Sequence, residues 1–305
     1  MSVRILEDRV VDRIAAGEVV ERPASVVKEL VENALDAGAR RVHVRLKHGG
    51  VGLVQVTDDG CGMSRDDAML CVERHATSKI LTADDLVGVA THGFRGEALP
   101  SIGSVARLEL RTRRADDEVG TEVVVDGGVL TGVRAVACPV GTEVSVRSLF
   151  SHTPARRKFL KSAQVELDHA IEAVRRAILR RPEVEVLVAH EARELLRAAA
   201  TEDPAVRVRD VLGTDAAVLI PVDERRGDVR VDGLMAPPGV HRGSSTGAVY
   251  VYVNGRFVRD TVLRRAIGEA WRGAIPAGRF PVLVIGVEVP AEDVDVNVHP
   301  QKTEV

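Results

Sequence analysis

Residues 23–38 read PASVVKELVENALDAG and have the pattern of one amphipathic helix. Pro23 suits the first turn of a helix, where its missing N–H is not needed, and Gly38 suits the position just past the end. One set of helical positions is apolar and predicts a buried stripe: Val27, Leu30, Val31 and Ala34. A second set with the same spacing is polar: Glu29, Glu32, Asn33 and Asp36. We therefore expect a helix over residues 23–37 with one buried stripe and one polar stripe.

Glu29 and Asn33 lie four residues apart, so their side chains point to the same side of the expected helix. Hydrolysis of ATP requires a group that orients or deprotonates water and an oxygen ligand for Mg²⁺ near the phosphates. A glutamate serves the first role, and an asparagine side-chain oxygen serves the second. Taken alone, however, the pair fits a solvated polar helix face better, so its meaning depends on other segments.

The segment Asp58-Asp-Gly60-Cys-Gly62-Met63 directly follows an expected strand over Leu53–Val56. Glycines let the backbone bend tightly and approach a ligand closely. A carboxylate at such a turn can accept a hydrogen bond from the amino group of adenine. A plain Asp-Gly turn explains the same residues. A calcium loop does not, because its alternating Asp or Asn residues and its distant Glu are missing.

The stretch from Asp66 to about Gly103 has many small and polar residues and no long periodic run, so it is a candidate mobile lid. It offers hydroxyl groups, two cations and glycine-flanked backbone N–H groups, which together suit an anion. The residues concerned are Thr77, Ser78, Lys79, Gly93, Phe94, Arg95, Gly96, Glu97, Ala98 and Leu99. The usual Gly-Lys-Ser/Thr phosphate loop is missing, and an ordinary flexible loop would have the same composition.

The chain has 305 residues, a length that normally forms two domains, and the polar segment Thr201–Pro204 is the best boundary between them. Strands are expected at Val42–Leu46, Leu53–Val56, Leu108–Thr112, Glu122–Val125, Glu143–Val146, Glu183–Ala189, Val249–Val253 and Val282–Val289. Helices are expected after Thr153-Pro154, over Val165–Arg181 and near Val262–Trp271. The expected fold class is α+β, followed by a smaller α/β unit.

Three cysteines without a paired spacing argue against a disulfide framework or a zinc site and fit a reducing cytosol. No apolar run reaches the ~18 residues that a membrane span needs, and the first residues do not resemble a signal peptide. We therefore expect a cytoplasmic protein without a membrane partner.

The net charge of −3 gives no global sign of a nucleic-acid partner, but residues 156–181 hold eight basic and three acidic residues. A local basic patch can bind phosphates because screening limits the effect of distant acids. Candidate DNA contacts are Arg156, Arg157, Lys158, Lys161, Arg264, Arg265 and Arg272. For any one of them, a solvated helix face is an equally good explanation.

In their order along the chain, these segments resemble the GHKL ATPase superfamily of DNA gyrase, the heat-shock chaperone ATPase, histidine kinases and MutL. The exact sequences of the motifs are similar to those of one branch, the MutL family of DNA mismatch-repair proteins. The motifs that carry this resemblance are Ile14–Pro23, Leu30–Gly38, Arg74–Ile80, Gly93–Leu99, Thr153–Leu160, Val253–Arg256 and Val294–Pro300. The resemblance extends from about residue 4 to the last residue.

The resemblance implies a Bergerat-type α/β sandwich, a mixed sheet covered by helices, over residues 1–203 with its ATP lid at about 74–100. A smaller, ribosomal-protein-like α/β domain over 204–305 follows, and it is expected to be truncated at its C-terminal end. Family members continue through a linker to a C-terminal dimerisation region, which in some members carries a nuclease. Nuclease activity is not expected in this chain.

The resemblance also implies roles for individual residues. Glu29 matches the general base, and Asn33 matches the ligand of Mg²⁺. Asp58 matches the residue that reads adenine, assisted by Thr142, with Gly60, Gly62 and Met63 beside it. The lid residues close over the triphosphate of ATP. Lys302 matches a lysine that reaches from the second domain to the γ-phosphate.

The implied function is an ATP-operated, slowly hydrolysing switch of mismatch repair. Its implied partners are DNA, held through sequence-neutral phosphate contacts, a mismatch-recognition protein and downstream repair enzymes. The implied homodimer uses ATP-dependent pairing of the N-terminal halves and the C-terminal region absent from this chain, and the expected location is the bacterial nucleoid. The alternatives are a topoisomerase-type ATPase subunit and a DNA-binding adaptor that does not hydrolyse ATP.

Overall fold

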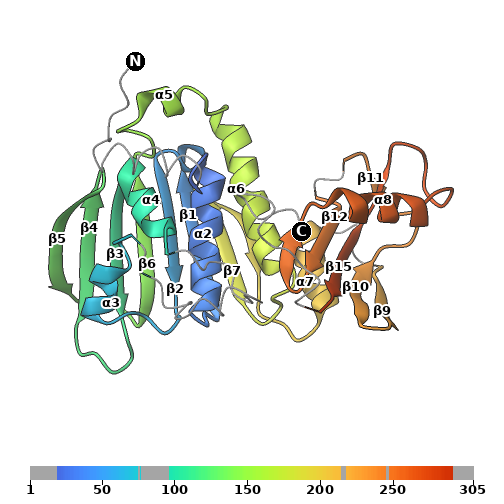
Figure 1. Ribbon diagram of the computed structural model, residues 1–305, viewed down its shortest axis with the longest axis horizontal. Helices are drawn as coiled ribbons and strands as arrows, with labels where there is room; N and C mark the ends of the chain where they lie inside the picture. Colours follow the sequence, from blue (N-terminus) through green and yellow to red (C-terminus); the bar gives the residue numbers. More distant parts are fainter. Residues whose placement is uncertain (1–18, 75, 77–95, 214–217, 245–246, 291–305) are drawn as a thin grey trace, which may run out of the picture. The chain divides into compact units, whose positions relative to one another are not determined.

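The computed structural model describes residues 19–74, 76, 96–213, 218–244 and 247–290 (Figure 1). The chain divides into two compact units. Among the described residues, the first unit contains those up to 174 and 184–197, and the second contains 175–183 and those from 198 onward. The predicted boundary at 203/204 stays a prediction.

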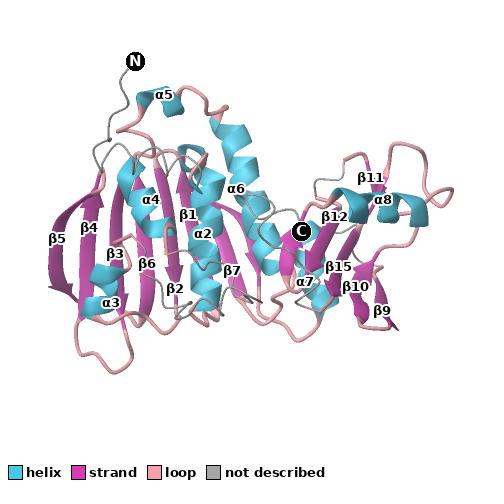
Figure 2. Ribbon diagram, in the orientation of Figure 1, coloured by secondary structure: helices cyan, strands magenta, loops and turns pink. Residues whose placement is uncertain are grey.

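The first unit is built on an eight-stranded sheet with the order β5-β4-β3-β6-β2-β1-β7-β8 (Figure 2). Its strands are β1 (Arg41–Lys47), β2 (Leu53–Asp58), β3 (Arg107–Arg113), β4 (Gly120–Asp126), β5 (Val129–Val136), β6 (Gly141–Arg147), β7 (Glu185–His190) and β8 (Arg193–Ala198). β1 and β7 pair in parallel, whereas the pairs from β5 across to β1 are antiparallel. The sheet is therefore mixed, as expected.

Helices cover one face of this sheet (Figure 1). They include α2 (Pro23–Asp36), which contacts β1 and β2, α3 (Arg65–Leu70), which contacts β4, and α4 (Ala98–Val105), which contacts β3 and β4. In β1 the burial alternates, with Val42, Val44 and Leu46 buried between exposed neighbours. A strand with this alternation has one face against the core and one face in solvent. The sheet and its helices thus form two layers.

The predicted helix at residue 23 is confirmed, and its apolar stripe of Val27, Leu30, Val31 and Ala34 is at most 3% exposed. Burial of each such side chain contributes about 1.5–3 kcal/mol relative to exposure for the larger members. The opposite stripe, with Glu29 and Asn33, is half-buried. Packing of α2 on the sheet therefore fixes which side of the helix is left for polar chemistry.

The second unit has a five-stranded sheet with the order β13-β12-β15-β10-β9. Its elements are α7 (Pro204–Leu212), β9 (Ile220–Arg226), β10 (Val229–Met235), β11 (His241–Arg242), β12 (Val249–Val253), β13 (Arg256–Val258), α8 (Thr261–Ala270), β14 (Phe280–Pro281) and β15 (Leu283–Glu288). β12 and β15 pair in parallel, and α8 packs Leu263 and Ile267 on the core beside Val251. A short sheet pairs β11 with β14.

Several sequence expectations are corrected. The stretch of about 66–103, in which the sequence shows no long periodic run, has two short helices at its ends, α3 and α4. The helix predicted to reach Arg181 is α6 (Ala163–Ile178), which is preceded by the short α5 (Pro154–Arg157). β5, β8, β9, β10 and α7 were not expected, for reasons of exposure and capping given below.

Candidate functional site

Three neighbouring strands place Asp58, Thr142 and Thr112 in one row. Asp58 at the end of β2 lies opposite Thr142 on β6, and Thr142 lies opposite Thr112 on β3. The hydroxyls of Thr112 and Thr142 are 3.0 Å apart, and Thr112 donates its proton to the carbonyl of Gly141 at 3.1 Å. Since Thr112 has only one hydroxyl proton, Thr142 is the donor between the two threonines. The lone pairs of Thr142 then remain as acceptors.

The turn after β2 is tied to the same row. The backbone N–H of Met63 donates to the Thr112 hydroxyl at 2.9 Å, and that of Gly60 donates to Asp58 Oδ1 at 2.9 Å. At Gly62 (φ 68°), a Cβ atom would lie 2.1 Å from the Arg113 carbonyl oxygen. A side chain at this position would therefore displace the turn from the strand, which explains the predicted glycine.

Asp58 is a half-buried carboxylate. Burial raises its pKa to about 6, against the opposing effect of the hydrogen bonds from the backbone of Gly60 and Thr142. Gly141 (φ 114°) allows the close pairing, because a Cβ there would lie 2.1 Å from the Asp58 carbonyl oxygen. Among the described residues no cation pairs with Asp58, so its oxygens keep lone pairs that can accept a further hydrogen bond.

The adjacent Asp59 has a different role. It accepts the backbone N–H groups of Arg40 and Arg41, each at 2.8 Å, and pairs with Arg41 Nε at 2.9 Å. These hydrogen bonds lower its pKa despite partial burial. Asp59 therefore fastens the turn to β1, and Asp58 is the carboxylate of this pair that is left for a ligand.

The polar stripe of α2 approaches this turn at its C-terminal end. The backbone N–H of Cys61 donates to the Ala37 carbonyl at 3.0 Å, and a Cβ at Gly60 would lie 2.8 Å from the Ala37 Cβ. Asn33 and Glu29 precede Ala37 by about one and two helical turns. The predicted carboxylate, amide and adenine-reading residues thus belong to one connected part of the structure.

Lys28 binds the predicted general base. Its Nζ lies 3.0 Å from Glu29 Oε1 and 3.3 Å from Glu32 Oε2. Burial acts to lower the pKa of Lys28, but the charges of Glu29 and Glu32 outweigh it and raise the pKa above its usual range. The sequence analysis did not identify Lys28 or Thr112, because no local motif around either residue predicts its contacts.

The ends of the expected lid meet. At Gly96 (φ 63°), a Cβ would lie 2.3 Å from the Ala76 carbonyl oxygen, so the chain before and after the lid is in close contact there. Glu97 lies 3.9 Å from Arg74 and precedes α4, whose first residues are Ala98 and Leu99. The remaining predicted contacts lie outside the described residues: Thr77, Ser78, Lys79, Gly93, Phe94, Arg95 and Lys302.

The residues present suit a Mg²⁺ ion whose other ligands are phosphate oxygens of a nucleotide and water. No group of three His, Cys, Asp or Glu side chains in the described ranges could hold a metal. Asn33 provides an amide oxygen beside half-buried carboxylates, and Mg²⁺ prefers such oxygen ligands together with phosphate oxygens and water.

Over the described ranges, no helix is long and apolar enough to cross a membrane.

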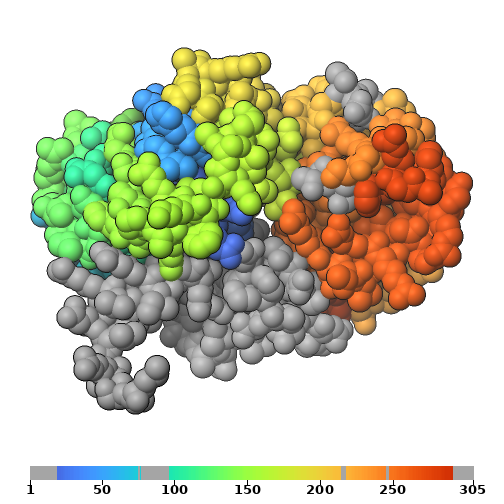
Figure 3. Space-filling model, turned by 90° about the horizontal axis from the view of Figure 1, so that it is seen from above, coloured from blue at the N-terminus to red at the C-terminus, as the bar shows by residue number. Residues whose placement is uncertain are grey.

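The predicted DNA contacts are mostly exposed. Arg157, Lys158 and Lys161 surround α5 at the surface of the first unit, shown in light green in Figure 3, and Arg156 is half-buried. In the second unit the exposed candidates lie on or after α8: Arg264, Arg265 and Arg272, the last paired with Glu269.

The basic residues later in the segment 156–181 make contacts within the protein. Arg176 lies over the Phe257 ring at 4.7 Å from its centroid, and Arg180 pairs with Asp232 at 2.8 Å. The eight basic residues of 156–181 therefore do not form one DNA-binding patch. Only the part before α6 keeps the exposure that phosphate contacts require.

Two family models match the chain. One is described as histidine kinase-, DNA gyrase B-, and HSP90-like ATPase and matches residues 21–126. The other is described as DNA mismatch repair protein, C-terminal domain, and matches residues 208–305. The gap between them contains β6, the strand that carries Thr142.

Curated relatives agree over nearly the whole chain. The DNA mismatch repair protein MutL of Anaeromyxobacter dehalogenans strain 2CP-1 is 52% identical over 304 residues, covering 99% of this chain and 50% of that protein. MutL of Geobacter sulfurreducens is 52% identical over 306 residues, with the same coverage of 99% and 50%. The chain thus spans about half the length of the curated relatives it matches.

Solved structures show the same fold. The Aquifex aeolicus MutL ATPase domain complexed with ADP is 30% identical, with a TM-score of 0.69, over 89% of this chain and 93% of that one. The B-subunit of DNA gyrase from Myxococcus xanthus has a TM-score of 0.59 at 15% identity over 97% of this chain and 89% of that one, a likeness of fold alone. The chain belongs to the MutL family of DNA mismatch-repair proteins, and its first unit has the GHKL-type ATPase fold.

Proposed function

We propose that this chain binds and hydrolyses ATP and acts as a nucleotide-controlled switch in DNA mismatch repair. The observation that carries the proposal is the half-buried Asp58 carboxylate in one row with Thr142 and Thr112, beside the polar stripe of α2. A desolvated acceptor next to a hydroxyl with free lone pairs suits the amino group of adenine. The family membership supports the same ligand.

The direction of α2 suggests how the nucleotide would lie. Adenine at Asp58 would sit near Ala37, and Glu29 begins about 12 Å further along the helix by its rise per residue. Asn33 lies between the two. The triphosphate would therefore extend along the polar stripe toward Glu29, with the residues of the lid stretch and Lys302 as further contacts.

Glu29 would act as the general base that orients and deprotonates the attacking water. Asn33 would hold Mg²⁺, which shields the negative charge of the phosphate oxygens. The half-buried position of both side chains on a packed helix limits their motion and keeps them preorganised. Slow turnover is expected, because the site must also respond to closure of a lid.

The test of this proposal is the Glu29→Ala variant. We expect ATP turnover to fall by about 10²–10⁴-fold, the usual contribution of a general base, with ATP binding retained. Glu118→Ala removes an exposed carboxylate from a turn of the same unit and serves as the matched control. Unchanged hydrolysis in Glu29→Ala would refute the role of Glu29, and a wild-type chain that binds ATP without hydrolysing it would favour the adaptor alternative.

We also propose that the exposed cations around α5 and α8 bind DNA through its phosphates without regard to sequence. About four phosphate contacts would weaken binding roughly a hundredfold between about 50 and 200 mM salt. Arg157→Ala and Arg265→Ala should each reduce the salt slope, whereas Arg193→Ala, at an exposed site on β8, should not. An affinity independent of salt would exclude phosphate contacts.

Pairing of two N-terminal halves is proposed as the response to ATP, and it would present a new surface to a mismatch-recognition protein and to downstream repair enzymes. Ordering of a segment by γ-phosphate contacts is a common way to couple nucleotide state to assembly. Light scattering of the chain with and without a non-hydrolysable ATP analogue measures this directly. A mass that stays monomeric with the analogue at saturation would contradict pairing in this chain.

A further inference from the structure

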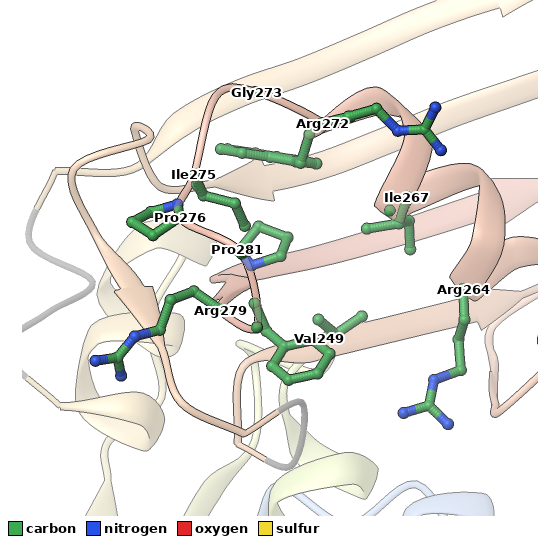
Figure 4. A pocket seen from close by; sticks show the side chains of 14 residues that line it. Val249, Arg264, Ile267, Arg272, Gly273, Ile275, Pro276, Arg279 and Pro281 are labelled. Atoms are coloured by element: carbon green, nitrogen blue, oxygen red, sulfur yellow. The ribbon is translucent and has the colours of Figure 1, made fainter.

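The second unit contains a cavity that no predicted nucleotide contact lines. Its volume is about 450 Å³, and it lies between the C-terminal part of α8 and the segment 272–281 (Figure 4). Eight of its fourteen lining residues are apolar, three are glycines and three are arginines. The volume is within the range of sites that take small ligands or several side chains of a peptide.

The walls of the cavity are fixed by the fold. Trp271 ends α8, and its backbone N–H donates to the Ile267 carbonyl at 3.1 Å. Gly273 (φ 78°) and Gly278 (φ 75°) then turn the chain back, and β14 anchors it by pairing with β11. Ile267 packs on the core of the unit, so α8 is fixed on one side of the cavity and β14 on the other.

The rim of the cavity is positively charged. Arg264 and Arg279 extend to opposite sides of an apolar centre that includes Val249 and Pro281 (Figure 4). No acidic side chain among the described residues pairs with Arg279, which is exposed. A Cβ at Gly243 would lie 3.1 Å from Arg279 Nη1, so the glycine leaves room for the guanidinium.

The charge of the surrounding segment is mainly positive. Residues 261–281 contain four arginines and one glutamate, and the fourteen lining residues include no acid. Arginine is the side chain best suited to bind carboxylates, because its planar donors pair with both oxygens. Trp271 and Phe280 add the aromatic surface that is enriched where peptides anchor.

We propose that this cavity docks an acidic peptide segment of a partner protein. Large apolar side chains of the peptide enter between Trp271 and Phe280, and its carboxylates meet Arg264 and Arg279. None of the lining residues is a predicted ATP contact, so the proposal does not rest on ATP hydrolysis.

A nucleic-acid strand is the other polyanion to consider. Such a strand is bound by a row of cations along successive phosphates, with bases stacked on exposed aromatic faces. Here Arg264 and Arg279 lie on opposite sides of a mainly apolar cavity, and the third lining arginine, Arg272, is paired with Glu269. Trp271 is half-buried. This arrangement suits apolar anchors with carboxylates at both sides better than a phosphate backbone.

The experiment uses the whole chain and its intrinsic fluorescence. Trp271 is the single tryptophan of the sequence, so its emission reports on this cavity directly. Random peptides of about twelve residues, displayed on phage, are selected on the wild-type chain and counter-selected on the Arg279→Glu variant. The enriched peptides and a short oligothymidylate are then titrated against the chain, with circular dichroism as the check on folding.

We expect enriched peptides that carry at least two acidic residues beside Leu, Phe or Trp, and a saturable shift of Trp271 emission. Arg279→Glu should weaken these peptides by at least about tenfold. Arg265 is an exposed arginine of α8 that does not line the cavity. Its replacement by alanine should leave the peptide affinity within about twofold while lowering the affinity for DNA.

Three results would overturn the proposal. One is a selection that yields no peptides dependent on Arg279. Another is enrichment of peptides without acidic residues. The third is saturable binding of oligothymidylate that depends on Arg279 and gives the same change in Trp271 emission as the peptides, which would make the cavity a nucleic-acid site.

Discussion

Lys28 Nζ lies 3.0 Å from Glu29 Oε1, so the predicted general base is already bound to a cation on its own helix. Adjacent residues of a helix do not normally face each other, but Lys28 also pairs with Glu32, four residues further along, at 3.3 Å. We therefore expect Lys28 to position Glu29.

Replacing Lys28 by methionine should lower kcat for ATP hydrolysis by about tenfold to a hundredfold, because the Glu29 carboxylate loses the group that orients it. KM should change less than about twofold. Lys28→Arg keeps the charge and should restore most of the rate, and Lys47→Met, on an exposed position of β1, is the control. A raised KM at unchanged kcat would instead make Lys28 a substrate contact.

ATP affinity should depend on the ionisation of Asp58. Burial raises its pKa from an ordinary value of 3.8 to about 6, so the carboxylate is charged above that pH and becomes protonated below it. An acceptor for adenine is lost on protonation. Affinity should therefore fall as the pH falls through 6, approaching tenfold per pH unit below it, and calorimetric titration measures this. Asp58→Asn should bind weakly at every pH, and a slope retained by this variant would assign the effect elsewhere.

The same pKa makes a prediction for stability. Because the folded pKa of Asp58 lies above the unfolded value, the stabilisation by its proton is complete below pH 3.8 and is lost as the pH rises through 6. Above that pH the buried charge costs up to about 3 kcal/mol. Asp58→Asn should therefore raise Tm at pH 8 while lowering the affinity for ATP. Equal Tm values at pH 8 would indicate that the buried charge costs nothing.

Thr112→Val should weaken both the fold and the nucleotide site. The variant keeps the shape of the side chain but removes the hydroxyl that joins Met63, Gly141 and Thr142. Loss of a partner for a buried donor costs about 1–3 kcal/mol, measurable by urea denaturation. ATP affinity should fall by about tenfold.

The matched control for Thr112 is Thr121→Val. Thr121 lies opposite Thr112 on β4 and is also buried, but it is one strand further from Asp58. Its replacement should leave ATP affinity within about twofold. Equal losses in both variants would show that any buried threonine in the row has the same effect.

Arg207→Met should destabilise the second unit. This fully buried side chain donates to the carbonyls of Pro182 and Ala199, each at 3.0 Å, and burial lowers its pKa. The Pro182 carbonyl keeps the backbone N–H of Thr201 at 2.8 Å, but the Ala199 carbonyl loses its guanidinium donor, at a cost of about 1–3 kcal/mol. Arg207→Lys should recover only part, since a single ammonium does not reproduce the planar fork. Thermal unfolding of the chain checks both variants, and an unchanged Tm in Arg207→Met would contradict this role.

Local sequence patterns were sufficient for α2 and for the turn at Asp58. The helix has a clear period and a glycine just past its end, and the turn has glycines at positions where a Cβ would strike backbone atoms. Thr112 could not be predicted in the same way. It meets Thr142 through the register of β3 and β6, a pairing of distant segments that neither segment encodes alone.

The elements that were missed share identifiable causes. β5 is exposed along most of its length, so no alternation of apolar and polar residues marks it as a strand. α7 was read as a boundary because of its polar start, although Asp203 caps the helix by accepting the N–H of Ala205 and Pro204 occupies the first turn. A polar segment that ends in Asp-Pro is thus as typical of a helix start as of a linker.

The parallel pairing of β1 with β7 has a consequence for synthesis of the chain. Every described contact of the proposed ATP site has left the ribosome once residue 142 has done so, but Arg41 finds its partner on the sheet only when Glu185 arrives. At about 5–20 residues per second, β1 remains an open edge for some 2–10 s. Until then the nascent chain presents the unpaired backbone of β1, an open strand edge of the kind that can pair with another chain.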